Sequence, residues 1–182
     1  MNLFSISSDQ EHGASMDITG LIGQYAHGNE PSHHTTYMYA YSGEPYKIAD
    51  KVRYINNELY TDQPDGLSGN EDCGQMSAWY IFSSMGFYPV NPSNGAYVFG
   101  SPLFDEVVIE VSTDKSFKII ADNNSDQNIY IQAVELNGKQ HNYSYITHKQ
   151  IINGGELRFI MGDSPNYNFG KDKKFRPASI VY

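Results

Sequence analysis

The chain has 182 residues, enough to enclose a hydrophobic core as one domain or as two small ones. It is acidic, with 21 Asp and Glu against 12 Lys and Arg, the opposite of what a phosphate-binding surface needs, so neither nucleic acid nor an anionic membrane is an expected partner. Its single cysteine excludes an internal disulfide bond, and no stretch reaches the ~20 apolar residues of a membrane-spanning helix.

Helical patterns occupy the first half of the chain. Apolar spacing predicts helices over about residues 31–43, 45–59 and 75–85. The first two begin at a proline, whose fixed φ suits the first helical turn, and the first ends at Gly43, so these two helices form an αα-hairpin.

The pattern changes to β-strands beyond about residue 90. Runs rich in β-branched and aromatic residues predict strands at 97–99, 107–111, 117–121, 129–136, 143–147 and 156–161. Asn137-Gly138 predicts a type I′ hairpin turn. Helices followed by strands indicate an α+β fold, which we divide near residues 91–95 into a helical unit, residues 1–92, and a strand unit, residues 93–182.

Two polar loops carry the candidate functional residues, GNEPSHH at 28–34 and GNEDCG at 69–74. If the helices that follow them pack side by side, two carboxylate clusters meet at one end of the helical unit. Oxygen atoms of Asn, Asp and Glu are ligands for a hard cation such as Ca²⁺, and a carboxylate can also activate water as a general base. The pattern equally allows Asp72 to be only the N-cap of the third helix.

Three other side chains in these loops have simpler interpretations. Adjacent histidines on a helix point about 100° apart, so His33 and His34 do not form a zinc pair, and we expect one of them to be packed and hydrogen-bonded. Cys73 lies among carboxylates, which disfavour the reactive thiolate, so we expect a small packing residue rather than a nucleophile.

Three long blocks resemble the C-terminal part of glycoside hydrolase family 92: HGNEPSHHTTYMYAYSGEPYK, PDGLSGNEDCGQMSAWYIFSSMGFYPV and GSPLFDEVVIEV. The resemblance implies a Ca²⁺-dependent, inverting exo-α-mannosidase that removes terminal, α-1,2-linked mannose from glycans. It implies that residues 1–92 are the last helices of an (α/α)6 barrel. Residues 93–182 would be antiparallel strands of a sandwich-like layer that packs on an N-terminal sandwich domain.

The resemblance also assigns roles to individual residues. Asp72 matches the general base, and Asn70 stands where some members have a second, assisting aspartate, so that position can hydrogen-bond but carries no charge. Glu30 matches a glutamate at the sugar and calcium end of the site. The implied sugar contacts are Glu30, His33 and His34. The implied calcium ligands are Glu30, Asn29 and Gln75.

The general acid of the family is a glutamate upstream of the matched region, and residues 1–21, Glu11 included, offer no match for it. We therefore expect a chain that is nearly inactive alone and whose partner is the missing N-terminal part of the same enzyme. The full-length bacterial protein would be periplasmic or secreted, although the first residues here lack a signal-peptide pattern.

Two alternatives remain open at this point. The 15 tyrosines could serve a non-catalytic carbohydrate-binding module, since a tyrosine offers both a flat apolar face and a hydroxyl, although tyrosine is equally common in half-buried strands. In that case the acidic loops would hold only a structural cation. A truncated product without a stable fold of its own is the third interpretation.

Overall fold

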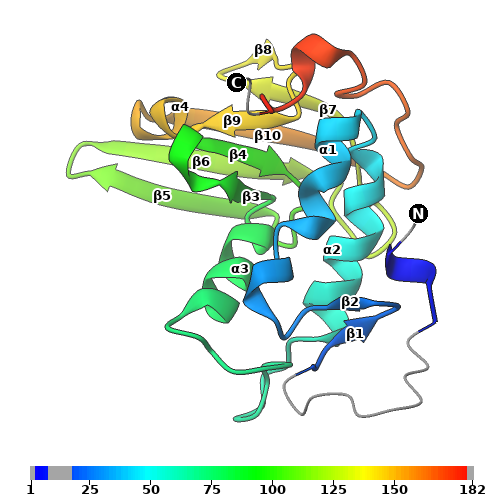
Figure 1. The fold of residues 1–182 in the computed structure, drawn as a ribbon. Coiled ribbons are helices and arrows are strands. Elements are labelled where there is room, and N and C mark those ends of the chain that lie inside the picture. The colour runs from blue at the N-terminus through cyan, green and yellow to red at the C-terminus, as the bar shows by residue number, and fades with distance from the viewer. Residues whose placement is uncertain (1–2, 8–17, 180–182) are drawn as a thin grey trace.

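The computed structural model describes residues 3–7 and 18–179, so Glu11 lies outside the described part of the chain. The helices are η1 (Leu3–Ser5), η2 (Glu30–Ser32), η3 (Thr35–Met38), α1 (Tyr39–Ser42), α2 (Tyr46–Glu58), α3 (Gln75–Ser84), η4 (Pro92–Asn94), α4 (His148–Ile152) and η5 (Lys173–Phe175), where η marks a 3-10 turn. The strands are β1 (Leu21–Ile22), β2 (Tyr25–Ala26), β3 (Phe87–Asn91), β4 (Ala96–Phe99), β5 (Glu106–Ser112), β6 (Lys115–Asp122), β7 (Tyr130–Leu136), β8 (Lys139–Gln140), β9 (Tyr145–Thr147) and β10 (Gly155–Gly162). Most helices gather in one half of the molecule and the long strands in the other (Figure 1). None of the helices in the described ranges has the length and apolar content needed to cross a membrane.

The segment expected to be one helix over residues 31–43 is instead a series of tighter turns. The 3-10 turns η2 and η3 precede a single turn of α-helix, α1. In η2, for example, the His33 N–H donates to the Glu30 carbonyl (3.1 Å), an i→i+3 bond. The prediction of a continuous helix was wrong because this segment is rich in Ser, His and Thr, which have low helix propensity. Its end is as predicted, with Gly43 in the left-handed region (φ 84°).

Helices α2 and α3 are confirmed close to their expected limits. α2 begins directly after Pro45 and α3 ends two residues before Gly86. The side chains that these helices bury join others from the helical half in one hydrophobic cluster, to which β4 contributes a valine: Tyr25, Tyr37, Ala40, Ile48, Val52, Ile55, Trp79 and Val98. This cluster fixes α3, and with it the second polar loop, against the rest of the helical half.

The strands form two larger sheets and confirm the predicted α+β class. The five-stranded sheet has the order β5-β6-β10-β7-β8, and the three-stranded sheet has the order β3-β4-β9. Neighbouring strands are antiparallel except β6 and β10, which run parallel with Leu157 opposite Ile119. The inner face of the larger sheet buries Phe117, Ile119, Leu157, Phe159 and Met161 in a second hydrophobic cluster.

Several elements of this half were not predicted, among them α4 and β3. α4 begins with a capping box, in which Thr147 and Gln150 bond to each other's backbone, and the T-x-x-Q spacing is a sequence signal for it. β3 pairs with β4, placing Tyr88 opposite Val98, so residues 91–95 form the turn of a hairpin. The predicted Asn137-Gly138 turn is confirmed, with φ values of 54° and 70°.

One buried cation joins the helical half to the strands. Arg53 of α2 is 5% exposed. Its Nε donates to the Ser101 hydroxyl (3.0 Å), and its Nη2 donates to the Pro102 carbonyl and the Asn124 side chain. The guanidinium therefore satisfies acceptors in two loops that lie between strands.

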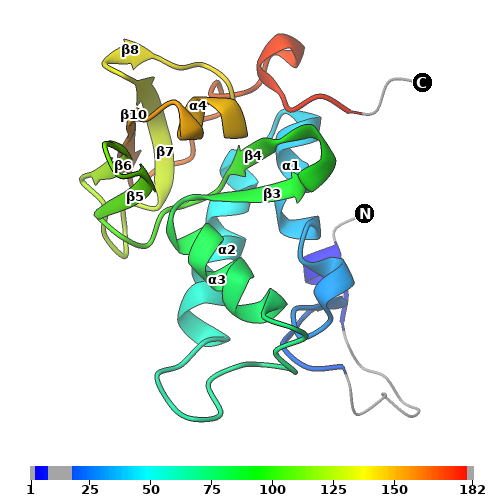
Figure 2. The same ribbon diagram turned by 90° about the vertical axis from the view of Figure 1, so that its left-hand side faces the viewer.

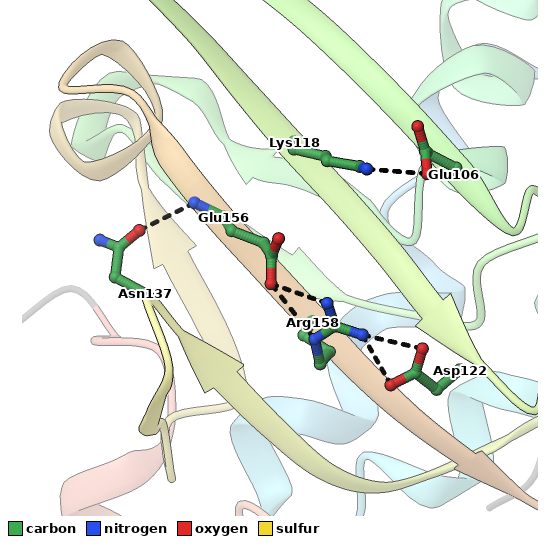
Figure 3. A network of polar contacts seen from close by, with 6 residues as sticks. All are labelled: Glu106, Lys118, Asp122, Asn137, Glu156 and Arg158. Carbon is green, nitrogen blue, oxygen red and sulfur yellow. Dashed lines mark hydrogen bonds and ion pairs between the residues drawn. The ribbon is translucent and has the colours of Figure 1, made fainter.

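We expect Arg53→Ala to lower the free energy of unfolding by about 2–4 kcal/mol, because a buried hydrogen bond to a charged group contributes about 1.5–3 kcal/mol and its loss leaves acceptors unpaired. Urea unfolding followed by circular dichroism measures the change. The matched control is Arg158→Ala: Arg158 pairs with Asp122 (2.8 Å) and Glu156 (2.9 Å) on the solvent-facing side of the sheet (Figure 3). Exposed ion pairs contribute little. Equal losses in the two variants would contradict the role of Arg53.

Candidate active site

The two polar loops lie against each other at the N-terminal end of α3, far from the five-stranded sheet (Figure 2). A Cβ atom added to Gly69 would lie 2.8 Å from the Gly28 Cα, and one added to Gly28 would lie 2.7 Å from the Ser68 carbonyl oxygen. Backbone therefore approaches backbone at distances that only glycine allows. This contact brings together the acids of the two loops.

A pocket of about 330 Å³ opens between the loops. Among the described residues its lining is polar: Thr19, Gly28, Asn29, Glu30, Gly69, Asn70 and Asp72. Of the residues selected from the sequence, Asn29, Glu30, Asn70 and Asp72 line this pocket. His33, His34 and Gln75 are not in the lining.

Asp72 is not the N-cap of α3, so that interpretation was wrong. The N-cap is Gly74, and Asp72, Cys73 and Gly74 all have left-handed backbones (φ 49°, 58° and 91°). The capping acid is Glu71, whose carboxylate accepts from the Ser77 N–H (2.9 Å) and hydroxyl (2.6 Å). Cys73 is exposed, so the expectation of a packing residue was also wrong.

The carboxyls of Asp72 and of Glu30, which comes from the other loop, line the same pocket and interact with each other. Partial desolvation raises the pKa of Asp72, and Glu30 raises it further by hydrogen bonding to the protonated form and by charge repulsion. His33 acts in the opposite direction. Two apposed carboxyls of this kind favour either proton transfer or a shared cation.

His33 lies behind the pocket wall, 1% exposed. Its Nε2 donates to the His27 carbonyl (2.9 Å), so its Nδ1 accepts from the Gln75 side-chain amide (3.1 Å). His33 is therefore the packed histidine that the sequence predicted. Because both of its ring nitrogens are already hydrogen-bonded, it has none free for a sugar, and the expected direct contact between His33 and the sugar is not supported. The same Gln75 amide lies 3.0 Å from the Tyr88 hydroxyl, which places Gln75 in this supporting layer. His34 is exposed.

A second histidine, His27, was not singled out from the sequence. It is fully buried, and its ring stacks on that of His33 with centroids 4.7 Å apart. The Tyr60 hydroxyl donates to the Met76 carbonyl (3.1 Å), so it accepts from His27 Nε2 (2.7 Å), and His27 Nδ1 accepts from Tyr25 (2.8 Å). His27 is thus a neutral imidazole. Its adjacency to the Gly28 loop is the one clue in the sequence.

Burial, followed by the electrostatic effect of the neighbouring His33 ring, lowers the pKa of His27 from 6.5 to about 3. Below pH 6.5 the unfolded chain therefore binds a proton that the folded chain does not bind until about pH 3. As the pH decreases from 6.5 toward about 3, we expect the free energy of unfolding to decrease by up to about 1.4 kcal/mol per pH unit. Urea unfolding at pH 7, 6 and 5 measures this slope.

Two variants separate the titration of His27 from its hydrogen bonds. His27→Gln removes this titrating ring and should reduce the slope, leaving the part that His33 and His141 contribute, because burial lowers the pKa of each of these two histidines as well. Tyr60→Phe removes a hydrogen-bond partner of His27 but keeps the ring, so it should lower stability and retain the slope. An unchanged slope in His27→Gln would contradict this assignment.

The pocket suits a hard cation by its donor chemistry. The described residues hold no group of three or more His, Cys, Asp or Glu side chains able to bind a metal, so a cation here would depend on two carboxylates and neutral oxygens. Ca²⁺ takes 6–8 oxygen ligands and accepts amide and carbonyl oxygens among them. Glu30, Asp72, Asn29 and Asn70 supply such oxygens, and a divalent cation would relieve the repulsion between the carboxylates.

Comparisons with known proteins agree with the sequence blocks. The model of the glycosyl hydrolase family 92 catalytic domain matches residues 2–163. A family 92 α-mannosidase of Bacteroides thetaiotaomicron, in complex with mannoimidazole, is 43% identical with a TM-score of 0.92, over 98% of this chain. A family 92 inverting mannosidase of the same organism is 42% identical with a TM-score of 0.81, over 86% of this chain.

A curated relative is described as an uncharacterized secreted glycosidase of Arthroderma benhamiae. It is 33% identical over 156 residues, or 84% of this chain. The match spans 20% of that relative and 21–23% of the two mannosidases, so this chain corresponds to about a fifth of each. With a family model that covers most of its length, the chain belongs to glycoside hydrolase family 92.

Proposed function

We propose that this chain carries the water-activating side of an inverting exo-α-mannosidase site, which removes terminal α-1,2-linked mannose from glycans. The observation that supports this proposal most directly is the pocket in which the carboxyls of Asp72 and Glu30 meet among neutral amides. Related structures are described as an α-mannosidase with bound mannoimidazole and as an inverting mannosidase. A sugar fits such a lining because its hydroxyls can pair with amides and carboxylates.

Asp72 is the proposed general base. A base must reach the water from which it removes a proton, and Asp72 is exposed at the pocket with its side chain not used in capping. Asn70, beside it, would orient the water or a sugar hydroxyl without taking the proton. Inversion then requires an acid on the opposite face of the sugar, with the two carboxyls about 6.5–9.5 Å apart, and we place that acid in the rest of the enzyme.

Glu30 and Asn29 would hold Ca²⁺. Gln75 is the proposed third ligand, and only its side-chain oxygen could bind the ion, because its side-chain nitrogen is hydrogen-bonded to His33 and Tyr88. When bound, the ion would hold neighbouring mannose hydroxyls and help distort the ring. His34, the exposed last residue of this loop, remains a proposed sugar contact at the rim. His33 would act by fixing the loop and not by touching the sugar.

The proposed architecture places residues 1–92 as the last helices of an (α/α)6 barrel. α3 supports this, because it is apolar on more than its buried face: Ile81 is 53% exposed and borders a second hollow of about 380 Å³ that includes Tyr60 and Tyr80. A helix that is apolar all round is normally covered on all sides. Residues 93–182 would pack on an N-terminal sandwich, and the full enzyme would be periplasmic or secreted.

The test is to express both this chain and a protein that extends it over the full length of its relatives. With calcium present, the long protein should release mannose from an aryl α-mannoside, with β-mannose as the first anomer seen by NMR. This chain alone should be nearly inactive, because loss of a general acid costs about 10²–10⁴-fold. A long protein that releases no mannose would overturn the proposal.

A further inference from the structure

Two adjacent acids in the second loop have different surroundings. Both carboxylate oxygens of Glu71 accept hydrogen bonds from Ser77, one from the backbone N–H (2.9 Å) and one from the hydroxyl (2.6 Å). Ser77 is the third residue of α3, so its N–H is among the first four, which have no partner within a helix. The next acid, Asp72, faces Glu30 across the pocket.

The backbone between Glu71 and α3 has an unfavourable conformation. Asp72 and Cys73 are left-handed although both carry side chains, and Gly74 continues the turn. Such a conformation persists only where surrounding contacts hold it. The two hydrogen bonds that Ser77 donates to Glu71 connect the two ends of this turn, so they are well placed to hold it.

The same residues could adopt a competing arrangement. Aspartate is a favoured N-cap, because its side chain can accept from the N–H of the second or third helical residue. Gly74, the actual N-cap, has no side chain to offer. Without Glu71 on the Ser77 N–H, Asp72 could turn back to the helix and leave Glu30. Capping of α3 by Glu71 therefore leaves the Asp72 side chain free to point into the pocket.

We propose that Glu71 is a positioning residue: by capping α3 through Ser77, it keeps the Asp72 carboxylate in the pocket beside Glu30. Glu71 does not touch the sugar or the water in this assignment. The expected effect of Glu71 on kcat rests on the proposed function. The expected effect of Glu71 on the direction of the Asp72 side chain does not.

The experiment compares four variants of the full-length enzyme. Glu71→Ala should lower kcat on the order of 10²-fold with KM little changed, the cost of a misplaced catalytic group. Glu71→Gln keeps an oxygen for the Ser77 N–H and should restore most of kcat. Ser77→Ala loses only the hydroxyl bond and should have an intermediate kcat. Asp65→Ala, at another exposed acid on the loop between α2 and α3, is the control and should retain wild-type kcat.

Crystal structures of the wild-type and Glu71→Ala proteins provide a readout that does not depend on activity. We expect Asp72 to leave Glu30 and to approach the Ser77 N–H in the variant. An unmoved Asp72, or a full kcat in Glu71→Ala, would overturn the inference and leave Glu71 as a helix cap that affects only thermal stability. If the wild-type enzyme releases no mannose, the proposed function fails, and the crystal structures alone decide the role of Glu71.

Discussion

Asp72→Asn is expected to lower kcat of the full-length enzyme by about 10²–10⁴-fold, the usual contribution of a positioned general base. The amide has the size of the carboxyl but cannot take a proton from water. Asparagine also tolerates the left-handed backbone that position 72 requires (φ 49°), so the turn should survive. Initial rates with an aryl α-mannoside and saturating calcium measure the effect.

The control for this variant is Asp65→Asn, an exposed acid of the same loop that does not line the pocket. It should have the kcat and KM of the wild type. A second measurement uses azide, a small anion that needs no deprotonation before it attacks the sugar. It should restore turnover of Asp72→Asn and give a β-mannosyl azide. Full activity of Asp72→Asn without azide would rule out the assigned base.

Local sequence patterns predicted much of the fold. α2 and α3 have apolar residues at helical spacing between clear start and stop residues, and most of the long strands are β-branched or aromatic runs bounded by turn residues. The Asn137-Gly138 turn was predictable because both positions require a left-handed backbone. In each case the deciding information lies within a few residues.

What could not be predicted depends on contacts between distant segments. The parallel pairing of β6 with β10 joins strands that β7, β8 and β9 separate along the chain, and no local pattern specifies it. For residues 31–43, apolar spacing suggested a helix, but the low propensity of the Ser, His and Thr residues prevailed.

The candidate site shows the same division. Glycine-bounded acids identified both loops, but the close approach of Gly28 to Gly69 that joins them is a tertiary contact. The sequence suggested Asp72 as the cap of α3, whereas the hydrogen bonds that Ser77 donates identify Glu71 as the capping acid. The sequence therefore identified the two loops that line the pocket and predicted one packed histidine, but it did not show which of the neighbouring acids caps α3.

Calcium removal is the second change for which we expect a large effect. Chelation with EDTA should suppress turnover by the full-length enzyme, and added Ca²⁺ should restore it. Mg²⁺ should not, because it demands near-ideal octahedral geometry and gives up its waters reluctantly. Elemental analysis of the treated protein confirms that the metal has been removed.

Glu30→Gln tests which residue holds the ion. The change removes one of the two pocket carboxylates and keeps the shape of the side chain, so the site loses charge without losing volume. Even outer partners of a metal site are worth about 10–100-fold in affinity or activity, and we expect at least this increase in the Ca²⁺ concentration for half-maximal rate. Glu58→Gln, at an exposed acid of α2 outside the pocket, should leave that concentration unchanged. A metal-free enzyme at full rate would exclude a calcium requirement, whereas an unchanged calcium dependence in Glu30→Gln would move the ion away from Glu30.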